Sequence, residues 1–168
     1  MSHAAHQRAS DALRVGFAVL TLSDTRTRET DTSGQLIRER LTAEGHRLIA
    51  EMIIKDESTQ LNEILDQWLG NGEIDVIITN GGTGLSKRDQ TVNTIESRFE
   101  RTIPGFGELF RMLSHREIGS AAMLSRATAG VINGKLIFVL PGSTAAVRLG
   151  INELVHPQIR HIVYELRK

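Results

Sequence analysis

The 168-residue chain contains no cysteine, and this absence excludes several kinds of chemistry. Disulfide bonds, thiolate metal sites and cysteine nucleophiles all require a thiol. The chain also has no surplus of either charge, because 20 basic residues balance 20 acidic ones. Proteins that bind the phosphate backbone of nucleic acids usually carry an excess of lysine and arginine, so nucleic acid is not an expected partner.

The amino terminus lacks the apolar segment of a signal peptide or membrane anchor. We therefore expect a disordered tail over residues 1–13, a cytoplasmic location and no membrane contact. Hydrophobic residues make up 40% of the chain, which is enough for one core, and no shift in composition marks a second domain. Residues 14–168 are expected to form a single domain.

Apolar segments alternate with amphipathic ones along the chain. Residues 15–22, 46–54 and 75–79 predict strands, and the first of these is apolar almost throughout, as in a strand buried on both faces of a parallel sheet. The expected helices lie at 31–45, 58–69, 91–99, 108–114, from 145 onward, and at 156–166. This alternation predicts a parallel sheet with right-handed crossovers.

Two segments interrupt this regular pattern. Asn133-Gly134, a pair typical of two-residue hairpin turns, separates apolar segments at 127–132 and 135–140. Residues 104–107, Pro-Gly-Phe-Gly, are expected to break the chain before the helix at 108–114. The predicted fold class is α/β, with three layers around a doubly wound, mostly parallel sheet that carries one antiparallel edge hairpin.

The most informative segment is 77–91, in which an apolar strand leads into Gly81-Gly82-Thr83-Gly84 and then into Arg88-Asp89. Glycine lets backbone N–H groups approach a ligand, and ligands of α/β sheets bind where strands end. A guanidinium suits phosphate, and a carboxylate suits Mg²⁺ or a proton. The segment fits neither a dinucleotide fingerprint nor a Walker loop, and taken alone it leaves open both an anion-binding loop and a simple turn.

Polar residues follow each of the expected parallel strands. They lie at Ser23-Asp24, 55–57, 81–89 and Pro141-Gly142-Ser143. Because the carboxyl ends of parallel strands share one edge, these segments are expected to meet in one crevice. The carboxylates of Asp24, Asp56 and Asp89 and the hydroxyls of Ser23, Thr83 and Ser143 suit a polyphosphate held with Mg²⁺, as in phosphoryl or nucleotidyl transfer.

Each of these side chains also has a simpler interpretation. Asp56 could cap the helix that follows it, and Asp89 could pair with Arg88 or cap the next helix. Asp24 could belong to a loop turn, and Ser143 could serve only as a helix cap. The residues alone leave these alternatives open.

Eight segments occur together in one known family. They are Ser23-Asp24, Asp31-Thr32-Ser33-Gly34, Lys55-Asp56-Glu57, Gly81-Gly82-Thr83-Gly84, Arg88-Asp89-Gln90-Thr91, Pro104-Gly105-Phe106-Gly107-Glu108, Ser125-Arg126 and Leu140-Pro141-Gly142-Ser143. With them the chain, from Val15 to about Pro157, resembles the MoaB/MogA family of molybdenum cofactor biosynthesis proteins, which is related to the G domain of gephyrin. The Asp-Thr-Ser-Gly segment favours the MoaB branch.

The resemblance implies an adenylyltransferase, which uses Mg-ATP to attach AMP to the terminal phosphate of molybdopterin and releases pyrophosphate. It implies that Asp56 and Asp89 are catalytic and hold Mg²⁺, and that Glu108, Ser125 and Arg126 lie near the pterin pocket. The expected substrate and phosphate contacts are Ser23, Asp24, Gly81, Gly82, Thr83, Gly84, Arg88, Pro141, Gly142 and Ser143.

The same resemblance implies a homotrimer or homohexamer and possible transfer partners in molybdenum cofactor assembly. Two alternatives remain at this point: a non-catalytic molybdopterin-binding or scaffold protein of the same pathway, and an unrelated nucleotide-binding module. Both aspartates are present in this chain, which favours the enzyme.

Overall fold

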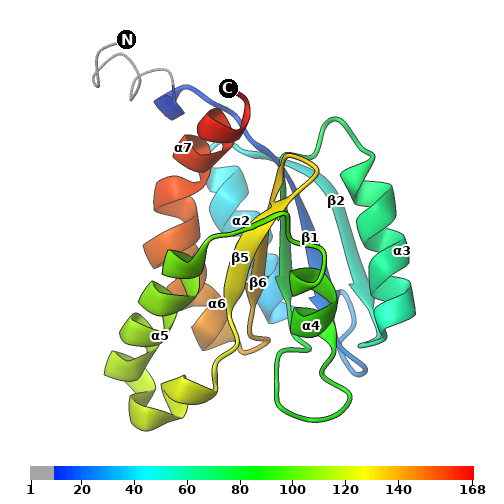
Figure 1. Cartoon of the computed structure of the whole chain (residues 1–168), viewed down its shortest axis with the longest axis vertical. Helices are drawn as coiled ribbons and strands as arrows, with labels where there is room; N and C mark the ends of the chain where they lie inside the picture. Colours follow the sequence, from blue (N-terminus) through cyan, green and yellow to red (C-terminus); the bar gives the residue numbers. More distant parts are fainter. Residues whose placement is uncertain (1–9) are drawn as a thin grey trace.

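The computed structural model describes residues 10–168, and within this range the strands form one six-stranded sheet (Figure 1). The strands are β1 (Gly16–Leu22), β2 (Arg47–Ile54), β3 (Val76–Asn80), β4 (Arg101–Thr102), β5 (Thr128–Ile132) and β6 (Lys135–Leu140). Their order is β2-β1-β3-β6-β5-β4. The first four strands in this order are parallel, whereas β5 is antiparallel to both β6 and β4.

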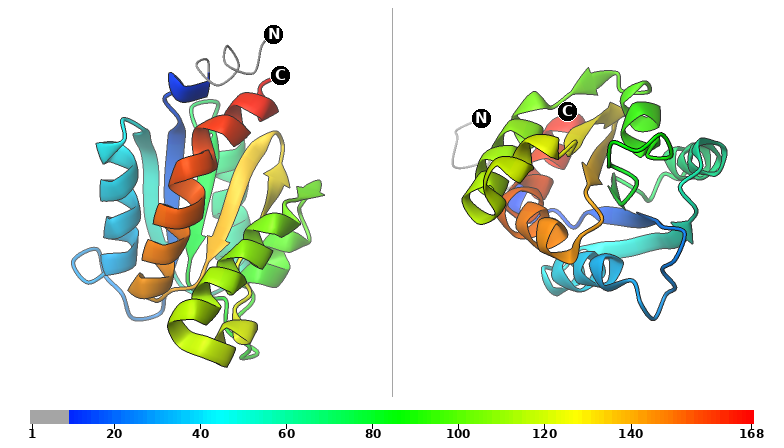
Figure 2. Two further views of the ribbon diagram at one scale, coloured as in Figure 1. Left: turned by 90° about the vertical axis from the view of Figure 1, so that its left-hand side faces the viewer. Right: turned by 90° about the horizontal axis from the view of Figure 1, so that it is seen from below.

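Helices cover both faces of the sheet (Figures 1 and 2). One face carries α2 (Thr32–Ala43), α5 (Pro104–Ile118), α6 (Thr144–Gly150) and α7 (His156–Leu166), and the other carries α3 (Ser58–Leu69) and α4 (Thr91–Glu96). The predicted three-layer α/β fold is therefore confirmed. A 3₁₀ segment, η1 (Gly119–Leu124), links α5 to β5.

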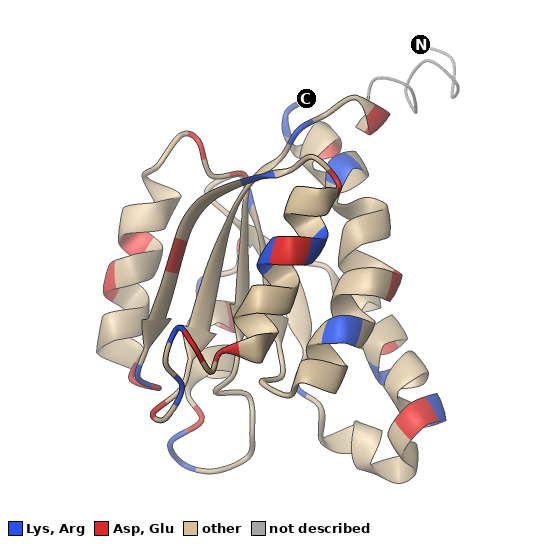
Figure 3. Cartoon of the chain, turned by 180° about the vertical axis from the view of Figure 1, so that it is seen from behind, with Lys and Arg blue, Asp and Glu red and all other residues tan. Residues whose placement is uncertain are grey.

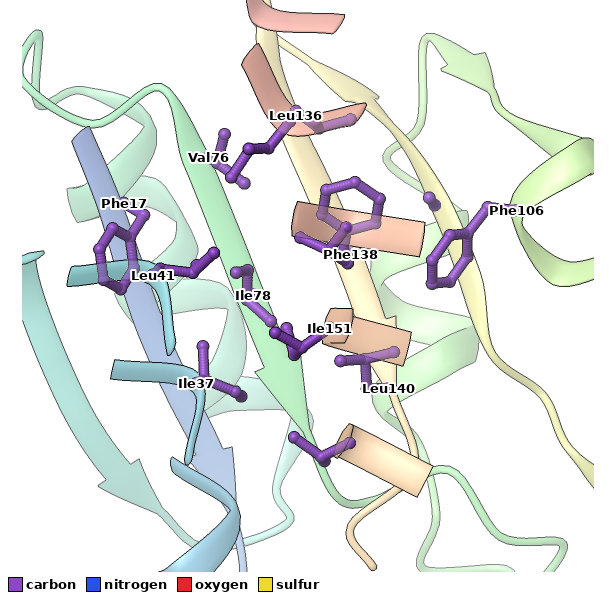
Figure 4. Close-up of a cluster of buried hydrophobic side chains, with 14 of the residues drawn as sticks. Phe17, Ile37, Leu41, Val76, Ile78, Phe106, Leu136, Phe138, Leu140 and Ile151 are labelled. Carbon is purple, nitrogen blue, oxygen red and sulfur yellow. The ribbon is translucent and has the colours of Figure 1, made fainter. Parts of the chain in front are cut away.

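The strand β1 is buried along its whole length, as its apolar sequence predicts. Phe17 and Val19 belong to the core beneath α2 and α5–α7, which Figure 4 shows in close-up. Ala18 and Leu20 belong to the core beneath α3 and α4. Because successive side chains of a strand point to opposite faces, a strand between two helical layers needs apolar residues at every position.

The hairpin between β5 and β6 forms at the predicted pair. Asn133 and Gly134 have φ values of 49° and 71°, and Ile132 pairs with Lys135 across the turn. A two-residue turn with both central residues at positive φ matches the twist of the flanking strands, and Asn-Gly tolerates it best. The edge of the sheet beyond β5 is formed by β4, a two-residue strand that the sequence analysis did not predict.

The helix predicted at 108–114 begins earlier and ends later than expected. Pro104 is the first residue of α5, and the helix continues to Ile118. Proline fits the first helical turn because its missing N–H would have no helical partner there. Residues 104–107 therefore start the helix, and the expectation that they break the chain is wrong.

The two helices expected near the carboxyl terminus are continuous with each other. A π-helical segment, η2 (Ile151–Val155), joins α6 to α7, and the His156 N–H bonds to the Ile151 carbonyl five residues earlier. Pro157 follows directly, and its ring would clash with a carbonyl in a regular α-helical turn. Prolines and π-helical turns are both sites at which long helices depart from regular geometry, and here the two lie side by side.

Part of the predicted disordered tail, residues 1–9, lies outside the described residues. Of the rest, Ser10 is buried and Leu13 packs against the core beneath α2 and α5–α7.

Candidate functional site

The segments that follow the parallel strands lie together at one edge of the sheet. The strands β1, β2, β3 and β6 all end there, and charged segments lie in the loops at this lower edge in Figure 3. We call this edge the rim. It contains the segments that the sequence analysis placed there, namely 23–24, 55–57, 81–89 and 141–143.

Asp56 lies half-buried in the rim, after the edge strand β2 and against the glycine loop. Its Oδ1 accepts a hydrogen bond from Thr91 Oγ1 at 3.3 Å. Burial raises the pKa of the Asp56 carboxyl above its ordinary value, the Thr91 bond opposes this, and the negative charges of Asp89 and Asp24 raise it further. The cap of α3 is Glu57, not Asp56, so the helix-cap interpretation of Asp56 is wrong.

Asp89 also has no capping role. Its Oδ2 accepts a hydrogen bond from the Ser86 N–H at 3.0 Å, while the cap of α4 is Gln90. The Arg88 guanidinium pairs with Asp24 Oδ2 at 2.6 Å rather than with Asp89. Both simpler interpretations of Asp89 therefore fail, and Arg88 neutralises part of the negative charge from across the rim.

The glycine loop approaches these carboxylates so closely that side chains would not fit. Gly82 has φ +67°, and a Cβ added there would lie 2.1 Å from Thr91 Oγ1 and 2.9 Å from both carboxylate oxygens of Asp56. A Cβ on Gly84 would lie 2.7 Å from Asp89 Oδ2. Glycine is therefore favoured at position 82 by space and by the positive φ, and at position 84 by space alone.

The backbone of this loop also offers free donors. Gly81 N–H bonds to the Leu140 carbonyl at 3.1 Å, whereas the N–H groups of Gly82, Thr83 and Gly84 have no acceptor among residues 10–168. Successive free N–H groups in a turn form a concave surface suited to anions. These free donors favour an anion-binding loop over a simple turn.

Two of the rim hydroxyls, those of Ser143 and Ser23, accept hydrogen bonds within the protein. Ser143 Oγ accepts from the Ala146 N–H at 3.2 Å and so caps α6, as its simpler interpretation proposed. Ser23 Oγ accepts from the Arg26 N–H at 3.0 Å within the loop after β1. Gly142 remains close to the glycine loop, since a Cβ on it would lie 3.2 Å from Gly81 Cα.

A separate hollow of about 370 Å³ adjoins the glycine loop, and it brings together the residues expected near a pterin pocket. Glu108, Ser125 and Arg126 all line it. Arg126 connects the hollow to the loop, because its guanidinium donates to the Gly84 carbonyl at 3.1 Å and also to Asn93 Oδ1. The sequence analysis missed Arg111, which lines the same hollow and donates to the Ala127 carbonyl at 3.1 Å.

Thr91 is a further residue that the sequence analysis did not assign to the site. Its side chain is fully buried, and its hydroxyl donates to Asp56 Oδ1. Its place directly after Arg88-Asp89-Gln90 was the signal that could have identified it.

Two searches of the described residues gave no match. Within residues 10–168, no three or more His, Asp or Glu side chains form a group that could hold a metal ion. None of the helices in this range has both the length and the apolar character needed to cross a membrane.

Comparisons with known proteins identify the family to which the chain is similar. A family model described as a probable molybdopterin binding domain matches residues 18–161. The molybdenum cofactor biosynthesis protein B of Bacillus subtilis (strain 168) is 47% identical over 163 residues, covering 96% of this chain and 95% of that protein.

Solved structures give the same result. A crystal structure of molybdenum cofactor biosynthesis protein B is similar with a TM-score of 0.89 and 46% identity, covering 92% of this chain and 97% of that one. The tungsten cofactor synthesizing protein MoaB from Pyrococcus furiosus is similar with a TM-score of 0.84 and 34% identity, covering 92% and 98%.

Proposed function

Because the chain belongs to the MoaB family of molybdenum cofactor biosynthesis proteins, with its molybdopterin-binding domain, we propose that it transfers AMP from Mg-ATP to molybdopterin. The observation that carries this proposal is the position of Asp56. Its carboxylate lies against a glycine loop with free N–H groups and close enough to Asp24 and Asp89 for both to raise its pKa. A protein that only binds the pterin has no need of carboxylates beside bound phosphate.

In the proposed step, an oxygen of the terminal phosphate of molybdopterin attacks the α-phosphorus of ATP. One phosphorus–oxygen bond forms, the bond from the α-phosphorus to the bridging oxygen breaks, and pyrophosphate leaves with the electron pair. Both reactants are anionic, so the site must lower their mutual repulsion and hold them in line. The free N–H groups of Gly82, Thr83 and Gly84 are placed to bind one phosphate.

The carboxylates of Asp56 and Asp89 are the proposed ligands of the Mg²⁺ that accompanies ATP. Mg²⁺ binds proteins through one or two carboxylates, and phosphate oxygens and waters complete its coordination, so a group of three protein ligands is not required. The observation that supports the fit is the environment of Asp56: burial raises its pKa, the charges of Asp89 and Asp24 raise it further, and a bound cation would favour its ionised form. Bound Mg²⁺ would neutralise charge on the transferring phosphate.

The hollow lined by Glu108, Arg111, Ser125 and Arg126 is the proposed pterin site. It adjoins the glycine loop through the Arg126 contact with the Gly84 carbonyl, so a pterin bound there could extend its phosphate toward Asp56. A guanidinium beside the hollow suits an anionic or carbonyl-rich ligand.

The test is an incubation of the purified protein with molybdopterin and Mg-ATP, followed by detection of adenylylated pterin and pyrophosphate. We expect both products in equal amounts, and neither after Mg²⁺ is removed with a chelator. Binding of molybdopterin without any product would instead support the alternative function, a non-catalytic molybdopterin-binding or scaffold protein of the same pathway.

The predicted homotrimer or homohexamer has support from one surface. Among residues 10–168, most of the exposed large hydrophobic side chains lie on α5 and η1: Leu109, Met112, Ile118, Met123 and Leu124. A cluster of this kind is typical of an interface. We expect Met112→Glu to shift the mass measured by light scattering toward the monomer, while Gln67→Glu on α3 leaves it unchanged. Transfer partners in cofactor assembly stay a prediction.

A further inference from the structure

A chain of buried hydrogen bonds lies directly beneath the rim and joins three distant segments of the sequence. Thr21 in β1, Asp31 at the N-cap of α2 and Asn80 at the end of β3 are 3%, 5% and 1% exposed. Asn80 Nδ2 donates to Thr21 Oγ1 at 3.0 Å, and Thr21 Oγ1 donates to Asp31 Oδ2 at 2.6 Å. These residues take no part in the site described above.

The direction of this chain is fixed by chemistry. The amide nitrogen of Asn80 can only donate, and the carboxylate of Asp31 can only accept, so the single hydroxyl proton of Thr21 must point toward Asp31. The other oxygen of Asp31 accepts from the Gly34 N–H at 2.9 Å. A short hydrogen bond to a carboxylate is stronger than a neutral one, and the three side chains therefore hold one arrangement.

The residues at both ends of this series of hydrogen bonds, Asn80 and Asp31, are next to loops of the rim. Asn80 is followed directly by Gly81 and Gly82, whose positive φ values start the glycine loop. At the other end, Asp31 holds the first turn of α2, where Ser33 Oγ donates to the Gly142 carbonyl at 2.9 Å. These hydrogen bonds thus link the glycine loop to the 141–143 loop through the interior of the protein.

Burying a carboxylate, an amide and a hydroxyl is costly compared with apolar side chains of similar size, and a gain that such a network can supply in return is specificity of structure. We propose that Thr21, Asp31 and Asn80 form a positioning unit that sets the spacing of the two loops for AMP transfer. This inference rests on the proposed function. None of the three residues touches the reacting atoms.

The first variant is Thr21→Val, which keeps the shape of the side chain and removes the hydroxyl. We expect kcat for AMP transfer to fall about tenfold to hundredfold, because small displacements of reacting groups have effects of this size. Amide hydrogen exchange of Gly81, whose N–H bonds to the Leu140 carbonyl, should become about tenfold faster. Molybdopterin affinity should change little, and Thr21→Ser, which retains the hydroxyl, should restore the wild-type values.

A second variant protects the test against misfolding. Thr21→Val leaves the buried Asp31 with one partner fewer, whereas Asn80→Leu removes the donor and leaves Asp31 with both of its hydrogen bonds. We expect Asn80→Leu to fold and to show the same loss of kcat and the same faster exchange.

The variant Thr79→Val is a matched control for Thr21→Val. Thr79 is the neighbouring residue in β3, is fully buried, and its hydroxyl has no hydrogen-bond partner. The substitution is chemically identical to Thr21→Val, and we expect it to leave both kcat and amide exchange unchanged.

If Thr21→Val and Asn80→Leu match Thr79→Val in kcat and in exchange, the positioning unit is disproved. If the wild-type protein shows no AMP transfer at all, the proposed function fails instead, and the exchange of the Gly81 amide still decides whether the unit holds the loop.

Discussion

The two ends of the sheet each bury a titratable side chain, and burial has opposite consequences for them. At the carboxyl ends of the strands, burial raises the pKa of Asp56. At the amino ends, His46 is 4% exposed, and burial lowers its pKa to about 4. Loss of water disfavours the charged form of both groups, which is the anionic form for Asp56 and the cationic form for His46.

The surroundings show why only one of these groups belongs to a site. Asp56 lies at an open rim beside other carboxylates, so a cation that binds there would offset the repulsion between their negative charges. His46 is enclosed, with Nδ1 accepting from the Val15 N–H at 3.2 Å. Among its charged neighbours, Arg160, His156 and Arg14 lower its pKa and only Glu44 raises it, so His46 is stable when neutral. A shifted pKa indicates function only where a ligand can reach the group.

The largest expected effect is that of Asp56→Asn. Removing this carboxylate should reduce AMP transfer by about a thousandfold, because electrostatic stabilisation of the transferring group is lost. Stability should not fall, since the folded protein disfavours the ionised Asp56 carboxylate. Transfer is measured as adenylylated pterin, and stability as the midpoint of chemical unfolding.

The matched control is Glu57→Gln, which removes the same charge from the next residue. Glu57 is exposed and makes no side-chain capping bond. We expect transfer close to the wild-type rate. Equal activity of Asp56→Asn and wild type would remove Asp56 from the mechanism.

The second-largest expected effect is a pH dependence of the free energy of unfolding, and it arises from His46 at the amino ends of the strands. The unfolded chain binds a proton on His46 near pH 6.5, but the folded protein does so only near pH 4, so stability is full above 6.5 and is lost as the pH falls toward 4. This difference in pKa corresponds to a loss of about 3 kcal/mol. Urea unfolding at pH 7 and at pH 4.5 measures it.

His46→Asn should remove this contribution, because asparagine can still accept from the Val15 N–H but does not titrate. His115→Asn on the exposed surface of α5 is the control. If the pH profile of His46→Asn matches that of wild type, other groups account for the acid sensitivity.

The smallest effect concerns Arg88, whose guanidinium is 67% exposed. Its positive charge lowers the pKa of Asp56, and it pairs with Asp24, which raises that pKa. Arg88→Gln should therefore raise the pKa of Asp56 and move the acidic limb of the pH–rate profile toward higher pH. An unshifted limb would show that solvent screens this exposed pair completely.

The sequence was sufficient wherever a single local rule decided the structure. The strand β1 was predicted because its residues are apolar on both faces, and the hairpin because Asn133-Gly134 accepts positive φ. The start of α5 was not predicted, because proline and glycine can either begin or end a helix and only packing against β5 decides between these outcomes. A Cβ on Gly107 would lie 2.8 Å from the Ala127 carbonyl, a contact between residues distant in sequence.

The same distinction between local rules and packing applies to the candidate site. Its segments could be placed at one edge from strand order alone, since parallel strands end together. The roles of Asp56, Asp89 and Ser143 could not, because a carboxylate or hydroxyl before a helix fits a cap and a ligand equally well. The structure shows that Ser143 caps a helix and that neither Asp56 nor Asp89 does.

The sequence by itself determined the α/β class, the family and the segments that form the rim, because these depend on periodicity, on turn residues and on motifs of adjacent residues. Only the tertiary structure decided which side chains face one another. The contact of Thr91 with Asp56, the pairing of Arg88 with Asp24 and the buried chain from Asn80 to Asp31 each join residues from separate elements. Such contacts depend on how elements pack, and packing is a property of the whole fold.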